Sequence, residues 1–148
     1  MGWLKRRLLR WLLGDALIYE VAAVLRGPDW SAPHLKYVFT ARVRALLGVD
    51  AMVPDVRRER EVTLSDVLEA AREARGWYER SRESFNHWFT HMHEALCALR
   101  LMERRGGAKA ELAELEQLLV GIAFYASGDL NEEGLIEGAR KLSICREG

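Results

Sequence analysis

Apolar and small residues recur at alternating intervals of three and four positions along the middle of the chain. The series comprises Ala71, Ala74, Tyr78, Ser81, Phe85, Trp88, Met92, Ala95, Leu99 and Met102. This spacing places one stripe of side chains along a helix that packs against other helices. It predicts a single long central helix over about residues 64–105. Gly76 is the position at which such a helix could kink or split.

Residues that favour helix ends flank this stretch. Thr63 can accept a hydrogen bond from the first turn while Asp66 reaches back to it, which is the arrangement of a capping box. At the other end, Arg104 and Arg105 precede two glycines, residues 106 and 107. That order is typical of a helix that stops in a left-handed turn with cations near its last carbonyls.

Four further segments show helical periodicity, and helices are predicted over residues 3–26, 33–47, 109–126 and 130–145. In the second of these, the side chains expected to face the core are Leu35, Val38, Phe39, Val43 and Leu46. Asp129 or Asn131 is the expected cap of the last helix. Residues 49–62, which contain Pro54, form the long irregular linker. The sequence therefore predicts an all-α fold, a single-domain bundle of about five helices spanning residues 1–148.

The formal net charge of zero conceals a gradient along the chain. Residues 1–48 carry eight basic and three acidic residues, giving +5. Residues 49–105 carry ten and eleven, giving −1, and residues 106–148 carry four and eight, giving −4. A basic head of this kind predicts docking on a macromolecular partner, with a protein expected and a nucleic acid as the alternative. The partner-binding candidates are Lys5, Arg6, Arg7, Arg10, Lys36, Arg42 and Arg44.

The first predicted helix allows two interpretations. It is basic and amphipathic, with Trp3 and Trp11 flanking its cations, so it suits either a core helix with an exposed arginine edge or a peripheral contact with a membrane. Asp15 and Glu20 interrupt the apolar core that a signal peptide requires. Two widely separated cysteines, of which Cys97 is predicted to be a buried free thiol, favour a reducing, cytoplasmic location.

The remaining composition is that of an ordinary folded protein, with 49% hydrophobic and 30% charged residues. Eighteen arginines accompany only four lysines, and asparagine and glutamine together number three. Few amides and many ionic side chains are typical of a thermophilic source, although a GC-rich genome also favours arginine over lysine.

One helix face gathers groups that can bind metals. Glu83, His87, His91 and Glu94 are spaced four, four and three residues apart, so they share a face opposite the predicted apolar seam. Imidazole and carboxylate together suit zinc or iron. One helix seldom supplies a whole site, and the chain holds no second Glu-x-x-His pair. A solvent-facing polar stripe is therefore the simpler interpretation, and no cofactor is predicted.

Arg82 and His87 are separated by four residues. This arrangement resembles the Arg-x4-His pattern of HEPN-type helical ribonucleases, in which the arginine and the histidine serve RNA cleavage across a dimer interface. The resemblance implies Arg82, His87 and the neighbouring His91 as catalytic candidates. A helical-bundle ribonuclease, or a metal-dependent hydrolase that uses Glu83 with the two histidines, is the enzymatic alternative.

A second local motif concerns Asp129, Asn131 and Glu133, which resemble the first half of a calcium-binding EF-hand loop. The twelfth position of that loop should be a glutamate that binds calcium through both oxygens, and here it is Arg140. The residues are therefore interpreted as a helix cap.

Two further segments carry a resemblance: RGPD, LK and FTARVR within residues 26–44, and FNHW followed by His91. They resemble segments of small helical proteins encoded by phages and prophages, and this resemblance implies no activity. Arg26 and Asp29 could form a polar cluster with Lys36 and the histidine face, or Asp29 could cap a helix. The leading functional hypothesis is non-enzymatic: a small helical binding protein, of the kind that serves as a phage adaptor or modulator.

Overall fold

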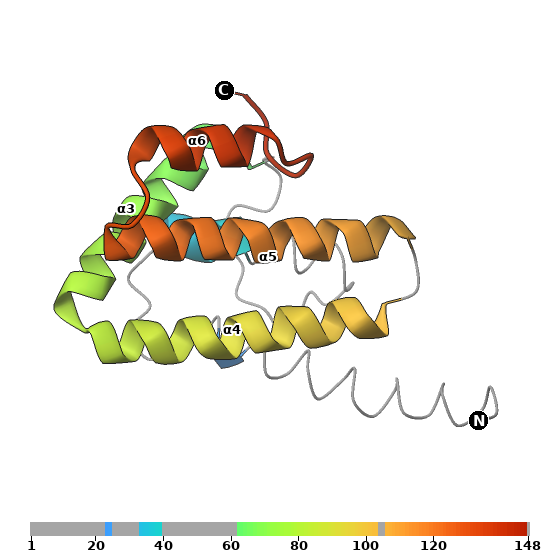
Figure 1. Cartoon of the computed structure of the whole chain (residues 1–148), viewed down its shortest axis with the longest axis horizontal. Helices are drawn as coiled ribbons and strands as arrows, with labels where there is room; N and C mark the ends of the chain where they lie inside the picture. Colours follow the sequence, from blue (N-terminus) through green and yellow to red (C-terminus); the bar gives the residue numbers. More distant parts are fainter. Residues whose placement is uncertain (1–22, 25–32, 40–61, 104–105, 148) are drawn as a thin grey trace.

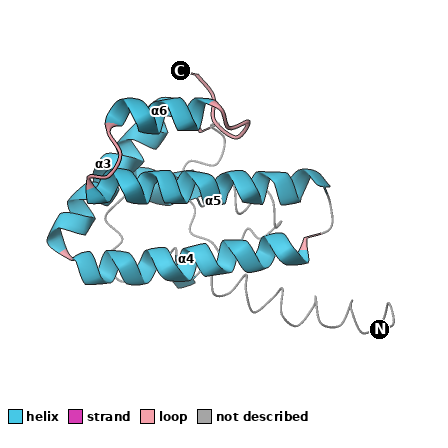
Figure 2. Ribbon diagram, in the orientation of Figure 1, coloured by secondary structure: helices cyan, strands magenta, loops and turns pink. Residues whose placement is uncertain are grey.

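The computed structural model describes residues 23–24, 33–39, 62–103 and 106–147. Within these ranges every regular element is a helix, and the one β-type pairing is an isolated bridge (Figure 2). The helices are α3 (Leu64–Arg80), α4 (Arg82–Met102), α5 (Gly106–Ser127) and α6 (Glu132–Arg140), and residues 33–39 are also helical. The predicted all-α bundle is confirmed. The predicted segments 3–22, 40–47 and 49–61 lie outside the described residues.

Among the described helices, α5 has neighbours on several sides. It packs against α3, α4 and α6, and in Figure 1 it runs antiparallel beside α4, with α6 on its other side. Its buried side chains form a broad apolar face that consists of Leu112, Leu115, Leu118, Leu119, Ile122, Tyr125 and Ala126. The segment 64–105 keeps a central place beside it, because α3 packs against α4, α5 and α6.

The prediction of one continuous helix over residues 64–105 is wrong, because the structure has two helices there. Ser81 has φ −153° and ψ 85°, which is not helical, and it ends α3 and begins α4. Its amide N–H donates to the Trp77 carbonyl at 2.9 Å, while its hydroxyl accepts from the Ser84 amide at 3.4 Å. The same serine therefore satisfies groups at both helix ends. Gly76, the position at which the helix could have kinked or split, lies inside α3.

The start of α3 is as predicted. The Thr63 hydroxyl accepts from the Asp66 amide at 3.2 Å, and the Asp66 carboxylate accepts from the Thr63 amide at 3.0 Å. The stop predicted at the two glycines is wrong. The helix α4 ends at Met102, with Glu103 extended at φ −75° and ψ 130°, and Gly106 opens α5.

The helices α3 and α4 meet in an elbow at Ser81, and an aromatic cluster fills its inner side. The ring centroid of Trp77 lies 5.5 Å from that of Phe85 and 5.3 Å from that of Trp88, and Phe39 meets Trp88 at 6.2 Å. The predicted seam is confirmed where it is buried, at Ala71, Ala74, Phe85, Trp88, Met92, Ala95 and Leu99. The predicted core residues within 33–39 are buried as well, namely Leu35, Val38 and Phe39.

The chain folds back after α6. Asn131 caps this helix by accepting from the Gly134 amide at 2.8 Å, which confirms that the motif is a cap. The helix ends at Arg140 rather than at residue 145. Beyond it, the Arg146 amide donates to the Val62 carbonyl at 2.9 Å. The backbone of the C-terminal segment thus pairs with the residues at the start of α3. Helical periodicity could not predict this contact.

Candidate functional site

Most of the predicted basic docking surface lies outside the described residues. This applies to Lys5, Arg6, Arg7, Arg10, Arg42 and Arg44, and also to the proposed polar cluster of Arg26 and Asp29. Lys36 is described. It is partly buried in the helical segment 33–39, and this burial lowers the pKa of its ammonium group.

The histidine face of α4 points outward, as predicted. Glu83, His87 and Glu94 are exposed, and His91 is partly buried. The rings of His87 and His91 meet edge to face with their centroids 4.4 Å apart. The structure therefore places these side chains on one surface. Among the described residues, however, the compact group of metal-ligating atoms is a different one.

Arg82, the other candidate from the ribonuclease resemblance, interacts across the elbow. Its Nε donates to the Tyr78 hydroxyl at 2.8 Å, and its guanidinium carbon lies 5.3 Å from the centre of the Tyr78 ring. Tyr78 in turn meets Phe85 edge to face at 5.5 Å. These contacts give Arg82 a role in joining α3 to α4, and its catalytic role stays a prediction.

The compact group of metal-ligating atoms comes from two helices. His93 and Cys97 lie four residues apart on α4, and Glu116 faces them from α5. His93 Nε2 lies 3.2 Å from Glu116 Oε1 and 3.8 Å from Cys97 Sγ. One ligating atom from each residue lies within 4.8 Å of the other two. Imidazole nitrogen, thiol sulfur and carboxylate oxygen thus converge at the seam between the two helices.

Neighbouring side chains hold this group in place. The Phe89 ring stacks on the His93 imidazole with centroids 5.6 Å apart and planes 14° apart. On the other side, Arg100 Nη1 donates to Glu116 Oε2 at 2.8 Å, which leaves Oε1 facing the histidine. The imidazole and the carboxylate are therefore oriented by contacts that do not use the converging atoms.

Cys97 differs from the sequence prediction, because it is partly rather than fully buried. Desolvation raises the pKa of its thiol, and the nearby Glu116 carboxylate raises it further, against the opposing effect of Arg100. The i,i+4 spacing of His93 and Cys97 was visible in the sequence. Glu116 was not, since only the packing of α5 on α4 brings it there.

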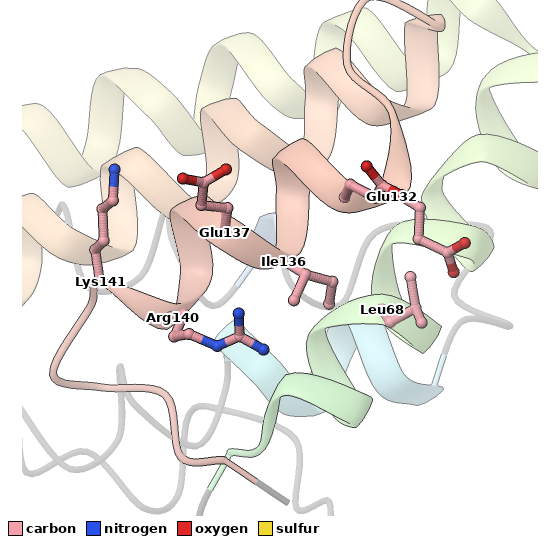
Figure 3. A pocket seen from close by; sticks show the side chains of 7 residues that line it. Leu68, Glu132, Ile136, Glu137, Arg140 and Lys141 are labelled. Atoms are coloured by element: carbon pink, nitrogen blue, oxygen red, sulfur yellow. The ribbon is translucent and has the colours of Figure 1, made fainter.

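A second feature is an open groove between α3 and α6 with a volume of about 750 Å³. Its lining residues are Leu68, Glu132, Glu133, Ile136, Glu137, Arg140 and Lys141. Figure 3 shows Leu68 and Ile136 pointing toward each other across the groove, with Glu132 and Arg140 on either side of them. The two apolar side chains are partly buried and form its floor, while the charged ones are exposed and form its rim.

No helix within the described ranges is both long enough and apolar enough to cross a bilayer. No protein-family model, no curated protein and no solved structure matches this chain. Any functional assignment therefore depends on the residues of the chain itself.

Proposed function

We propose that this chain is a small helical binding protein that docks a partner protein, with the groove between α3 and α6 as one docking surface. The observation that carries the proposal is the composition of that groove. Leu68 and Ile136 are partly buried apolar residues at its floor, while its rim is charged. Peptide segments that bind in grooves use apolar anchors for affinity and surrounding charges for specificity.

The charges on the rim fall into two kinds. Glu132 is held by Arg72 at 2.8 Å, and Arg140 is held by Glu147 at 2.6 Å. Within the described part of the chain, Glu133 and Glu137 form no ion pair. These two carboxylates can meet cations of a partner without breaking an existing pair. The groove therefore suits a segment that is apolar on one side and basic on the other.

The charge of the N-terminal residues can serve the same task. The value of +5 over residues 1–48 favours an acidic patch on the partner, while the groove favours a basic segment. A partner with both features would match both sets of charges. The adaptor role expected from the sequence is in line with such a partner.

Site-specific photo-crosslinking in the source cells tests this proposal. A photo-reactive residue at position 133 or 137 should capture one discrete protein, and the same residue at the exposed position 83 should not. The variant Glu133→Gln/Glu137→Gln should weaken the capture and keep the fold. The matched control is Glu79→Gln/Glu83→Gln, because Glu83 is also a first-turn acid of its helix and both control residues are exposed. Equal capture from all positions, or no capture at all, would contradict the groove as a docking surface.

A further inference from the structure

The seam between α4 and α5 carries a chemistry that a docking protein does not need. Three side chains of different ligand classes converge there, one of them from a different helix than the other two. We propose that His93, Cys97 and Glu116 bind one divalent cation of the Zn²⁺ class. This site is independent of the groove between α3 and α6.

The distances fit the size of a tetrahedral zinc ion. Bonds of about 2.3 Å to sulfur, about 2.05 Å to nitrogen and about 2.0 Å to oxygen set tetrahedral separations of roughly 3.3 Å for N···O and roughly 3.5 Å for N···S. The structure has 3.2 Å between His93 Nε2 and Glu116 Oε1, and 3.8 Å between His93 Nε2 and Cys97 Sγ. Both pairs are therefore within a few tenths of an ångström of the bound arrangement.

The third pair requires at most a side-chain adjustment. Cys97 Sγ and the ligating oxygen of Glu116 lie within 4.8 Å of each other, and a shared zinc ion would hold them at roughly 3.5 Å. A side-chain rotation that shortens this distance would complete the site.

The donor set selects the kind of ion. A thiolate and an imidazole disfavour Mg²⁺ and Ca²⁺, which take oxygen ligands, and both suit Zn²⁺. Ionised Cys97 and Glu116 would balance the charge of the cation within the seam. His93 and Glu116 are 36% and 20% exposed, so the ion can enter from solvent and a water can complete its coordination.

One surrounding contact, that of Arg100, is of the kind found in supported metal sites. Residues that orient metal ligands hydrogen-bond the atoms that the metal does not use. Arg100 holds Glu116 through Oε2, and Phe89 fixes the plane of the His93 ring. A plain network of His93, Glu116 and Arg100 would join the helices without any need for a thiol. Cys97 is therefore the residue that separates a metal site from an ordinary polar contact.

The test uses the purified full chain, freed of metal with a chelator and titrated with Co²⁺ as a spectroscopic probe for Zn²⁺. One Co²⁺ should bind per chain and give the near-ultraviolet charge-transfer band of a cobalt–thiolate bond, and one equivalent of Zn²⁺ should remove that band. Cys97→Ser should abolish the band and weaken Zn²⁺ binding by about 100-fold or more. Arg100→Gln, which removes an orienting contact only, should keep the band and weaken binding by about 10- to 100-fold.

Matched controls come from the same chain. His87→Gln/His91→Gln removes the other pair of α4 histidines, and Cys145→Ser removes the other cysteine, so both variants should bind one Co²⁺ with an unchanged band. Circular dichroism verifies the fold of each variant, and His93→Gln replaces Cys97→Ser if the latter does not fold. A parent chain that shows no thiolate band overturns the proposal without any variant. A band that survives Cys97→Ser, or one that is lost in Cys145→Ser, overturns it as well.

Discussion

The helix α4 carries two sets of side chains with the same local spacing and different surroundings. His87 and His91 are four residues apart on its outer face, with their rings 4.4 Å from each other. His93 and Cys97 are also four residues apart, but they face α5 and meet Glu116. Spacing along one helix predicts which of its own residues are neighbours. Whether those neighbours become a site depends on what the adjacent helix contributes.

The largest effect should separate two adjacent residues of α4. Trp88 is 6% exposed within the aromatic cluster, whereas His87 is on the outer face. Trp88→Ala should lower the free energy of unfolding by about 3–5 kcal/mol, since it removes a large buried side chain and leaves a cavity. His87→Ala should change it by less than about 0.5 kcal/mol.

Chemical denaturation measures both variants. The Trp88 variant should unfold at a lower denaturant concentration with little change in slope, while the His87 variant should overlay the parent. A loss below about 1 kcal/mol for Trp88→Ala would place the buried side of α4 elsewhere. The distinction between the two faces would then have to be redrawn.

A smaller effect is expected at the start of α4, where Ser81 caps the helix that carries both faces. Ser81→Ala removes the hydroxyl that accepts from the Ser84 amide. We expect a loss of about 0.5–1 kcal/mol in the free energy of unfolding, at the lower end of the range for such caps because the contact is long. Ser84→Ala, at an exposed position in the first turn, is the control and should have little effect. Equal losses in both variants would contradict the capping role of Ser81.

The apolar stripe of α3 and α4 and the capping box of α3 were predictable from sequence, because each depends on residues close together in the chain. The apolar stripe through Phe85, Trp88 and Met92 needs only the helical period, and Thr63 and Asp66 are three residues apart. The elbow was not predictable in this way. Ser81 fits the period of the stripe, so the pattern passes through it unbroken, although the chain turns there and brings Trp77 onto Phe85.

Contacts between carboxylates and backbone amides far away in the chain could not be predicted from the sequence either. Glu73 accepts from the Leu35 amide at 2.8 Å across 38 residues, and Glu114 accepts from the Ser143 amide at 3.2 Å across 29. Both acids look like ordinary charged positions of a helix. The packing of the helices determines their partners, and the same is true of Glu116 and His93. Of the three candidate metal ligands, the spacing along α4 can indicate His93 and Cys97 but not Glu116.

A modest effect is expected at the polar contact between His93 on α4 and Glu116 on α5. Glu116→Gln weakens the contact with His93 and removes the ion pair with Arg100, and because these side chains are 20–37% exposed we expect a loss of only about 0.5–1 kcal/mol in metal-free protein. A double-mutant cycle isolates the contact. The effects of Glu116→Gln and His93→Gln should deviate from additivity, while those of Glu116→Gln and His87→Gln should add within about 0.3–0.5 kcal/mol. Additive behaviour in the first pair would mean that His93 and Glu116 are not coupled in solution.

The smallest effect is expected on the outer histidine face. His87→Gln/His91→Gln should leave the free energy of unfolding within about 0.5 kcal/mol of the parent, because neither side chain contributes to the buried core. The same variant also sharpens the functional contrast between the faces. If the chain is a docking protein, single-stranded RNA incubated with the parent, with this variant and with Arg82→Gln should stay equally intact. Cleavage by the parent that both variants lose, with unfolding unchanged in the histidine variant, would assign the outer face to RNA hydrolysis. The ribonuclease would then replace the docking proposal, since side chains without a catalytic role would not be required for cleavage.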